Sequence, residues 1–200
     1  MTLSTYLAAT VTEDVARVAE ELYQVNREML GTPDAVEPIR GPEEYDGPGV
    51  RRIDHRPGIG LPAWLLMNYR AEGSKAIPFT PDSDWEYEGD ELEEERRYHE
   101  RDPWRNGTAS IQVNWDTAYS YRGPHGESCS DLHALYIEHV GRWLDERGID
   151  WHWKNEYTGE WHHGRDGLAE FSRFHRPGGD ADNWFQGVMA AIRANGGVQV

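Results

Sequence analysis

The sequence contains very little cysteine and no long apolar run. Cys129 is the single cysteine among 200 residues, so no disulfide can form within the chain and packing must hold the fold. Such a chain fits a reducing compartment, and we expect a cytoplasmic protein. The N-terminus has no basic residue before its short apolar stretch, which argues against a signal peptide. No apolar run approaches the roughly 20 residues that a membrane-spanning helix needs, so we expect no membrane insertion.

Basic residues are also scarce relative to acidic ones. The chain has 36 acidic and 20 basic residues, and its formal net charge is −16. This balance argues against binding to a phosphate backbone, so we expect no direct binding of nucleic acid. The sequence also lacks a glycine-rich phosphate loop, Gly-x-Ser-x-Gly and His-Glu-x-x-His. It therefore indicates none of the familiar enzyme classes.

Helical periodicity is clearest near the N-terminus and in the second half of the chain. Residues 10–30 repeat apolar side chains at helical spacing, and Thr10 with Glu13 matches a capping box. A second helix is predicted at 131–147, with Ser130 as its N-cap. Two closing helices are predicted at 166–174 and 180–195.

Apolar runs and period-two alternation predict four strands. These strands are expected at 63–71, 110–121, 149–157 and 160–163. Residues 32–62 contain six prolines, which indicates a long Pro/Gly-rich loop with one short strand near 50–54. Together the elements predict a single α+β domain over residues 1–200. In this domain the N-terminal, middle and C-terminal helices pack on a small antiparallel sheet.

Residues 82–102 form the most acidic segment, with eleven carboxylates against three arginines. Such a run is typical of a solvated loop that leads into a short charged helix, here near 91–100. It also fits a docking surface for a basic protein partner. The candidate partner-binding residues are Asp90, Glu93, Glu94 and Glu95. The nine tryptophans indicate that some of these large rings lie at a surface groove.

The segment 149–163 predicts a hairpin that turns at Thr158-Gly159. A loop with an odd number of residues would place His152, Glu156 and His162 together, opposite the tryptophans. Two imidazoles and a carboxylate can bind a divalent metal, so these three residues are the candidate metal ligands. The pattern also fits the polar side of an amphipathic hairpin, whose charged side chains pair with each other. We expect no cofactor in that second case.

Cys129 lies at the start of the second predicted helix, where the helix macrodipole lowers a thiol pKa. His125 or His133 could act as the base for such a thiol, so Cys129 and His125 are candidate catalytic residues. The same stretch also fits a Ser/Asp cluster that caps the helix, with a cysteine that has no chemical role.

One segment resembles a group of known proteins. The residues Trp143-Leu-Asp-Glu-Arg-Gly-Ile-Asp-Trp-His-Trp-Lys-Asn-Glu-Tyr-Thr-Gly-Glu-Trp-His162 are similar in style to small uncharacterised proteins of actinobacterial phages or of actinobacteria. The resemblance implies expression in a bacterial host, as an accessory factor, a host-directed factor or a minor virion component. It implies no activity and no role for any residue. A phage-encoded chain would act in the host cytoplasm.

The acidity, the tryptophan excess and the missing catalytic motifs favour a non-enzymatic interaction protein of phage or actinobacterial origin. It would bind a protein partner through an acidic and aromatic surface, and the acidity makes a basic protein the candidate partner. The alternative is a metal-dependent hydrolase that acts on a nucleotide or nucleic acid through the hairpin histidines. A concave pocket lined by histidines would favour the hydrolase, and scattered histidines would favour the binding protein.

Overall fold

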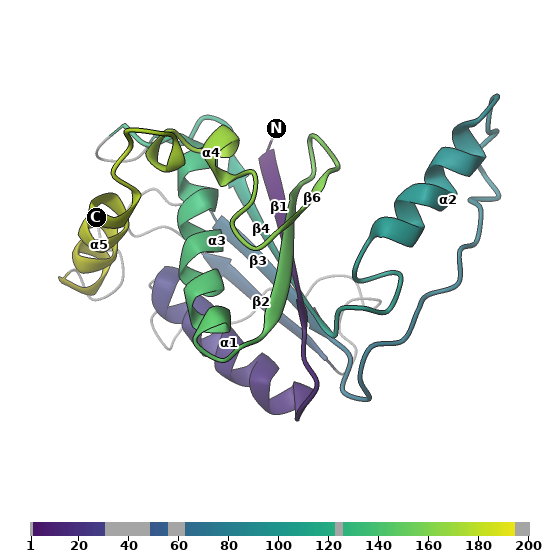
Figure 1. Cartoon of the computed structure of the whole chain (residues 1–200), viewed down its shortest axis with the longest axis horizontal. Coiled ribbons are helices and arrows are strands. Elements are labelled where there is room, and N and C mark those ends of the chain that lie inside the picture. The colour runs from purple at the N-terminus through teal and green to yellow at the C-terminus, as the bar shows by residue number, and fades with distance from the viewer. Residues whose placement is uncertain (1, 31–48, 56–62, 123–125, 195–200) are drawn as a thin grey trace.

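The protein folds around one antiparallel sheet (Figure 1), as seen in a computed structural model that describes residues 2–30, 49–55, 63–122 and 126–194. The strand order is β2-β3-β4-β1-β5-β6, and every neighbouring pair is antiparallel. This sheet and its helices confirm the predicted α+β class. No helix among the described residues is long and apolar enough to cross a membrane.

The strands are β1 (Thr2–Thr10), β2 (Val50–His55), β3 (Ala63–Tyr69), β4 (Ile111–Ala118), β5 (Asp150–Asn155) and β6 (Trp161–His163). The helices are α1 (Val15–Leu30), α2 (Glu91–Arg101), α3 (Cys129–Asp145), α4 (Leu168–Phe171), the 3-10 helix η2 (Arg173–His175) and α5 (Ala181–Ala194). The five expected strands, the short one near 50–54 included, are present. The rest of the predicted 32–62 loop falls mainly in 31–48 and 56–62, which lie outside the described residues.

β1 occupies the centre of the sheet although the periodicity above predicts no strand there. Leu7 of β1 lies opposite Val113 of β4 on one side and Trp153 of β5 on the other. Alternate residues of β1 from Leu3 to Ala9 are buried, as the period of a half-buried strand requires. β1 is therefore the only strand that joins β2-β3-β4 to β5-β6 within the described sheet.

α1 and α3 lie against one face of the sheet, and the core forms between them (Figure 1). Trp115 of β4 is fully buried, and its indole Nε1 donates to Asn26 Oδ1 at 3.1 Å. Asn26 Nδ2 in turn donates to the Leu22 carbonyl at 2.9 Å, so a polar side chain of α1 is buried with its hydrogen bonds made. The other face of the sheet is called the open face below.

The start of α1 differs from the predicted one. Thr10 ends β1, and its hydroxyl donates to the Thr108 carbonyl, so it does not cap a helix with Glu13. α1 begins at Val15, and the Asp14 carboxylate accepts from the Arg17 amide at 3.2 Å. The predicted cap is wrong because Thr10 has the β-branched shape of a strand residue and pairs in the sheet.

The N-cap of α3 lies two residues before the predicted one. Ser128, not Ser130, is the N-cap, and it forms a capping box with Asp131. Asp131 Oδ1 also accepts from Ser172 Oγ at 3.0 Å, which ties the helix to the segment after α4. The capping box fixes the residue at which α3 begins, and this start places His133 on the side of the helix that faces the core.

Candidate functional site

Residues 70–110 form an arm that leaves the sheet after β3, carries α2 and returns into β4 (Figure 1). Asp90 precedes α2, whose first turn is acidic and whose last turn is basic, in the order that the helix dipole favours. His99 Nε2 is hydrogen-bonded to the Ile77 carbonyl at 2.6 Å, and the Arg70 guanidinium lies 4.1 Å from the Trp104 ring centre. These contacts hold the two legs of the arm together.

The Lys154 side chain joins the arm to the sheet. Its ammonium lies 4.9 Å from the Tyr6 ring centre, 4.7 Å from that of Tyr98 and 5.1 Å from that of Trp161. It also hydrogen-bonds to the Tyr98 hydroxyl and lies 4.0 Å from Asp102 Oδ2. We call Lys154, Tyr6, Tyr98, Trp161 and Asp102 the lysine cage. Because β1, β5, β6 and the arm each contribute to it, the cage fixes where the arm lies on the open face.

Burial in the lysine cage also changes an acid–base property. Burial, with the nearby Glu156 carboxylate, raises the pKa of Tyr6 to about 12. The Tyr6 hydroxyl donates to Glu156 Oε1 at 3.5 Å, and this contact contributes to the raised pKa.

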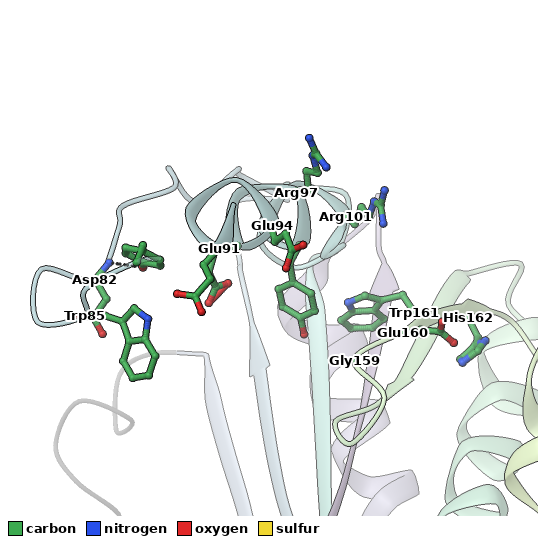
Figure 2. Close-up of a pocket in the computed structure, with 13 residues that line it drawn as sticks. Asp82, Trp85, Glu91, Glu94, Arg97, Arg101, Gly159, Glu160, Trp161 and His162 are labelled. Atoms are coloured by element: carbon green, nitrogen blue, oxygen red, sulfur yellow. Dashed lines mark hydrogen bonds between the residues drawn. The ribbon is translucent and has the colours of Figure 1, made fainter. Parts of the chain in front are cut away.

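A groove of about 1260 Å³ lies between the arm and the β5–β6 hairpin, and Figure 2 shows the side chains that line it. Its walls combine carboxylates with large aromatic rings. The acidic lining residues are Asp82, Glu91, Glu94, Glu95 and Glu160. The aromatic lining residues are Trp85, Tyr87, Tyr98 and Trp161. The volume exceeds the 300–1,000 Å³ typical of small-molecule pockets and suits a peptide segment.

The electrostatics of the groove favour a cation. Five carboxylates line it against the two guanidinium groups of Arg97 and Arg101, and in Figure 2 both arginine side chains extend away from Trp85 and Trp161. Trp85 is 63% exposed, so its ring face is accessible from solvent. An accessible indole beside several carboxylates attracts arginine or lysine side chains through both charge and cation–π contact.

The predicted partner-binding residues divide into two pairs. Glu94 and Glu95 line the groove. Glu93 instead lies within 3.4 Å of the Arg97 guanidinium and 4.0 Å of that of Arg96, and Asp90 occupies the N-cap position of α2. The structure therefore brings two of the four acidic candidates to the groove.

A smaller cavity of about 650 Å³ adjoins the groove. It shares Asp82, Tyr87 and Glu95 with the groove and reaches Lys154 on the open face. Its walls also include Phe79, Trp104 and Asp102, so they are aromatic and acidic like those of the groove.

The hairpin register separates the predicted metal ligands. Lys154 lies opposite Trp161, which leaves an even number of residues in the turn, and His152 lies opposite His163. His162 is consequently on the core face, where its ring stacks on Trp153 with centroids 4.7 Å apart. The predicted odd loop is wrong, and His162 does not lie with His152 and Glu156. The physical reason is that Trp161 is held in the lysine cage on the open face.

A different set of ligand-type residues meets at this edge of the sheet. The ligand atoms of Asp150, His152 and His163 all lie within 4.8 Å of one another on the open face. His163 Nε2 is hydrogen-bonded to Asp150 Oδ1 at 2.7 Å, and the rings of His152 and His163 have centroids 4.9 Å apart. Burial lowers the pKa of His152, which favours the neutral imidazole that a metal requires.

The predicted catalytic pair gains no geometric support. Cys129 is buried at 5% exposure, and burial raises the pKa of its thiol, opposite to the lowering expected from the helix dipole. His125 lies outside the described residues. His133 is fully buried, and its two ring nitrogens are hydrogen-bonded to Thr5 and Thr117 at 2.8 Å.

Sequence reasoning missed several residues of these sites. Trp85, Glu91 and Glu160 line the groove; the acidic run 82–102 was the available signal for Glu91, and the excess of tryptophan was the available signal for Trp85. Asp150 and His163 were missed because their proximity depends on the hairpin register. The i, i+2 spacing of Asp150 and His152 on one strand was the available signal for that pair.

Comparison of the chain with protein-family models, curated proteins and solved structures gives no match.

Proposed function

We propose that the protein binds a partner protein through a basic, arginine- or lysine-containing segment that lies in the groove between the arm and the β5–β6 hairpin. The observation that carries this proposal is the convergence of five carboxylates and the exposed Trp85 on one peptide-sized groove. The partner segment would lay cationic side chains on the indole and phenol faces while the carboxylates surround them.

The position of the groove supports binding rather than a merely solvated acidic face. The lysine cage holds Tyr98 and Trp161 against the sheet, and both of these aromatic residues line the groove. Walls that are held in place before binding lose less conformational entropy when a ligand arrives, so a given set of contacts gives a higher affinity. The net charge of −16 adds long-range attraction for a basic partner, and this attraction acts mainly on the association rate.

The test uses a fluorescein-labelled synthetic peptide in which arginines alternate with glycine and serine, measured by fluorescence polarisation. The matched peptide carries citrulline, which is neutral, at each arginine position. We expect saturable binding of the arginine peptide, weaker binding at high ionic strength and no saturable binding of the citrulline peptide.

Two triple variants with the same charge change locate the binding surface. Glu91→Gln, Glu94→Gln and Glu95→Gln remove carboxylates from the groove, and this variant should bind the arginine peptide about tenfold more weakly. The control triple changes three exposed carboxylates that do not line the groove: Glu13→Gln, Glu72→Gln and Glu146→Gln. Equal affinity in the two triples would show that only the net charge attracts the peptide, and it would overturn the proposal. Trp85→Ala should weaken binding without any change in charge.

The metal-dependent hydrolase stays a prediction. The histidines from which it was inferred lie on opposite faces of the sheet, and the groove contains His162 as its only histidine among the described residues.

A further inference from the structure

We infer that Asp150, His152 and His163 form a binding site for a divalent transition metal, with zinc as the best match, at the β5–β6 edge of the open face. This site is separate from the groove and uses a ligand set that the sequence did not predict. The ligand types, two imidazoles and one carboxylate, are those found in zinc sites with three protein ligands and an open fourth position.

The backbone places the three residues correctly for a shared ion. Asp150 and His152 are two residues apart on β5, so both side chains lie on the same face of the sheet. His163 is the direct cross-strand partner of His152, and such partners have Cβ atoms about 4.5–5.5 Å apart. All three positions therefore belong to paired strands, whose backbone holds them without a loop rearrangement.

The side chains need only a small adjustment to reach ligand geometry. Bonds of about 2.0–2.2 Å at tetrahedral angles put ligand atoms roughly 3.4 Å apart. The three ligand atoms are now within 4.8 Å of one another, and His163 Nε2 to Asp150 Oδ1 is already 2.7 Å. Side-chain rotation of His152 toward that pair closes the remaining distance. A metal bound by both residues would replace the present hydrogen bond between His163 and Asp150.

The surroundings leave room and add no opposing charge. Ala8 is the neighbour of His152 on β1, so a small side chain lies on the inner side of the cluster. Lys154, two residues along β5 on the same face, could repel a cation, but its ammonium is turned into the lysine cage toward Tyr98 and Asp102. Asp150 and His163 are exposed, so an ion can enter from solvent.

The experiment is calorimetric titration of ZnCl2 into the full chain, purified without a histidine tag and stripped with a chelator. We expect saturable binding of a single ion per chain. His152→Ala and His163→Ala should each weaken the binding by about tenfold or more, because each removes a direct ligand. Titration with CoCl2 supplies a second readout, since cobalt bound by nitrogen and oxygen ligands in a four-coordinate site gives a visible absorption band.

Two control variants test whether the loss of zinc binding is specific to the proposed ligands. Glu156→Gln changes a carboxylate on the same open face, and His162→Gln changes the histidine that stacks on Trp153 on the opposite face. Both should bind zinc as the parent protein does. Circular dichroism without metal verifies that every variant is folded. Absence of saturable binding in the parent protein, or equal binding in the His152→Ala and His163→Ala variants, would overturn the inference.

Discussion

Lys154 Nζ lies 4.0 Å from Asp102 Oδ2, and both side chains are almost closed to solvent, at 9% and 5% exposure. Lys154 belongs to β5 and Asp102 to the arm, so the pair joins two parts of the fold that are far apart in the sequence. Asp102 Oδ1 also accepts from the amides of Trp104 and Arg105, at 2.9 and 3.3 Å. This buried pair therefore determines how firmly the arm, and with it one wall of the groove, is held on the sheet.

Lys154→Met should loosen the arm. Methionine keeps most of the apolar stem but leaves the buried Asp102 carboxylate without the ammonium, so we expect a loss of about 2–3 kcal/mol in the free energy of unfolding. Chemical denaturation measures this loss, and hydrogen exchange of residues 70–110 should become faster. Lys75→Met, at the other lysine of the chain, alters an exposed pair with Glu72 and should leave the free energy of unfolding nearly unchanged. Equal effects at the two lysines would contradict the role of the cage.

The buried His133 should make the fold sensitive to mild acid. Burial lowers the pKa of His133 to about 3, whereas in the unfolded chain it is near 6.5. Between these values only the unfolded state binds the proton, so stability falls as the pH drops below about 6.5, by up to about 3 kcal/mol at pH 4. His133→Gln should show a shallower loss in thermal unfolding over this range. An unchanged pH dependence in that variant would assign the acid sensitivity to other groups.

Glu138 should make folding stability depend on pH in a second, lower range. Burial alone would raise the pKa of this carboxyl, but His175, Arg165 and Arg142 lower it to about 2. Because the folded pKa lies below the unfolded value of about 4.3, the stabilisation is present above that value and is lost as the pH falls toward 2. Glu138→Gln should lower stability by about 1–3 kcal/mol at neutral pH and flatten its dependence below pH 4.5. Guanidinium denaturation at several pH values measures both effects.

Two helical glycines should respond in opposite directions to alanine. A Cβ at Gly141 of α3 would overlap the ring of Trp151, which is packed in the core, whereas a Cβ at Gly187 of α5 would meet nothing within 4 Å. Gly141→Ala should therefore destabilise the fold by about 1–3 kcal/mol through overpacking. Gly187→Ala should stabilise it by up to about 1 kcal/mol through helix propensity. Melting temperatures separate the two cases, and a stabilised Gly141→Ala variant would contradict the packing of α3 on β5.

Periodicity in the sequence predicted the elements that bury one face and leave the other face more exposed. β4 alternates from Ile111 to Ala118 as predicted, because one side of it meets the core and the other does not. α2 was predicted from charge and lies at Glu91–Arg101. β1 was missed because its buried positions include Thr5 and Ala9, whose hydrophobicity hardly differs from that of their neighbours.

The candidate sites were less predictable for a physical reason. The groove depends on where the arm folds back, and the lysine cage that fixes it draws on Tyr6, Tyr98, Lys154 and Trp161 from separate elements. The metal ligands depend on hairpin parity, and a turn longer than two or three residues leaves parity unspecified by local turn chemistry. Tertiary contacts of Trp161, and not the turn sequence, settle which histidines face each other.

The place of β1 in the sheet also bears on how a growing chain behaves during synthesis. Leu7 is synthesised long before its partners Val113 and Trp153, which lie far downstream in the chain. Closing two such long loops costs entropy and slows folding. Until β5 emerges from the ribosome, β1 paired with β4 presents an unsatisfied, apolar strand edge to other nascent chains. Yield in a heterologous host should therefore depend on synthesis rate and on chaperones that cover this edge.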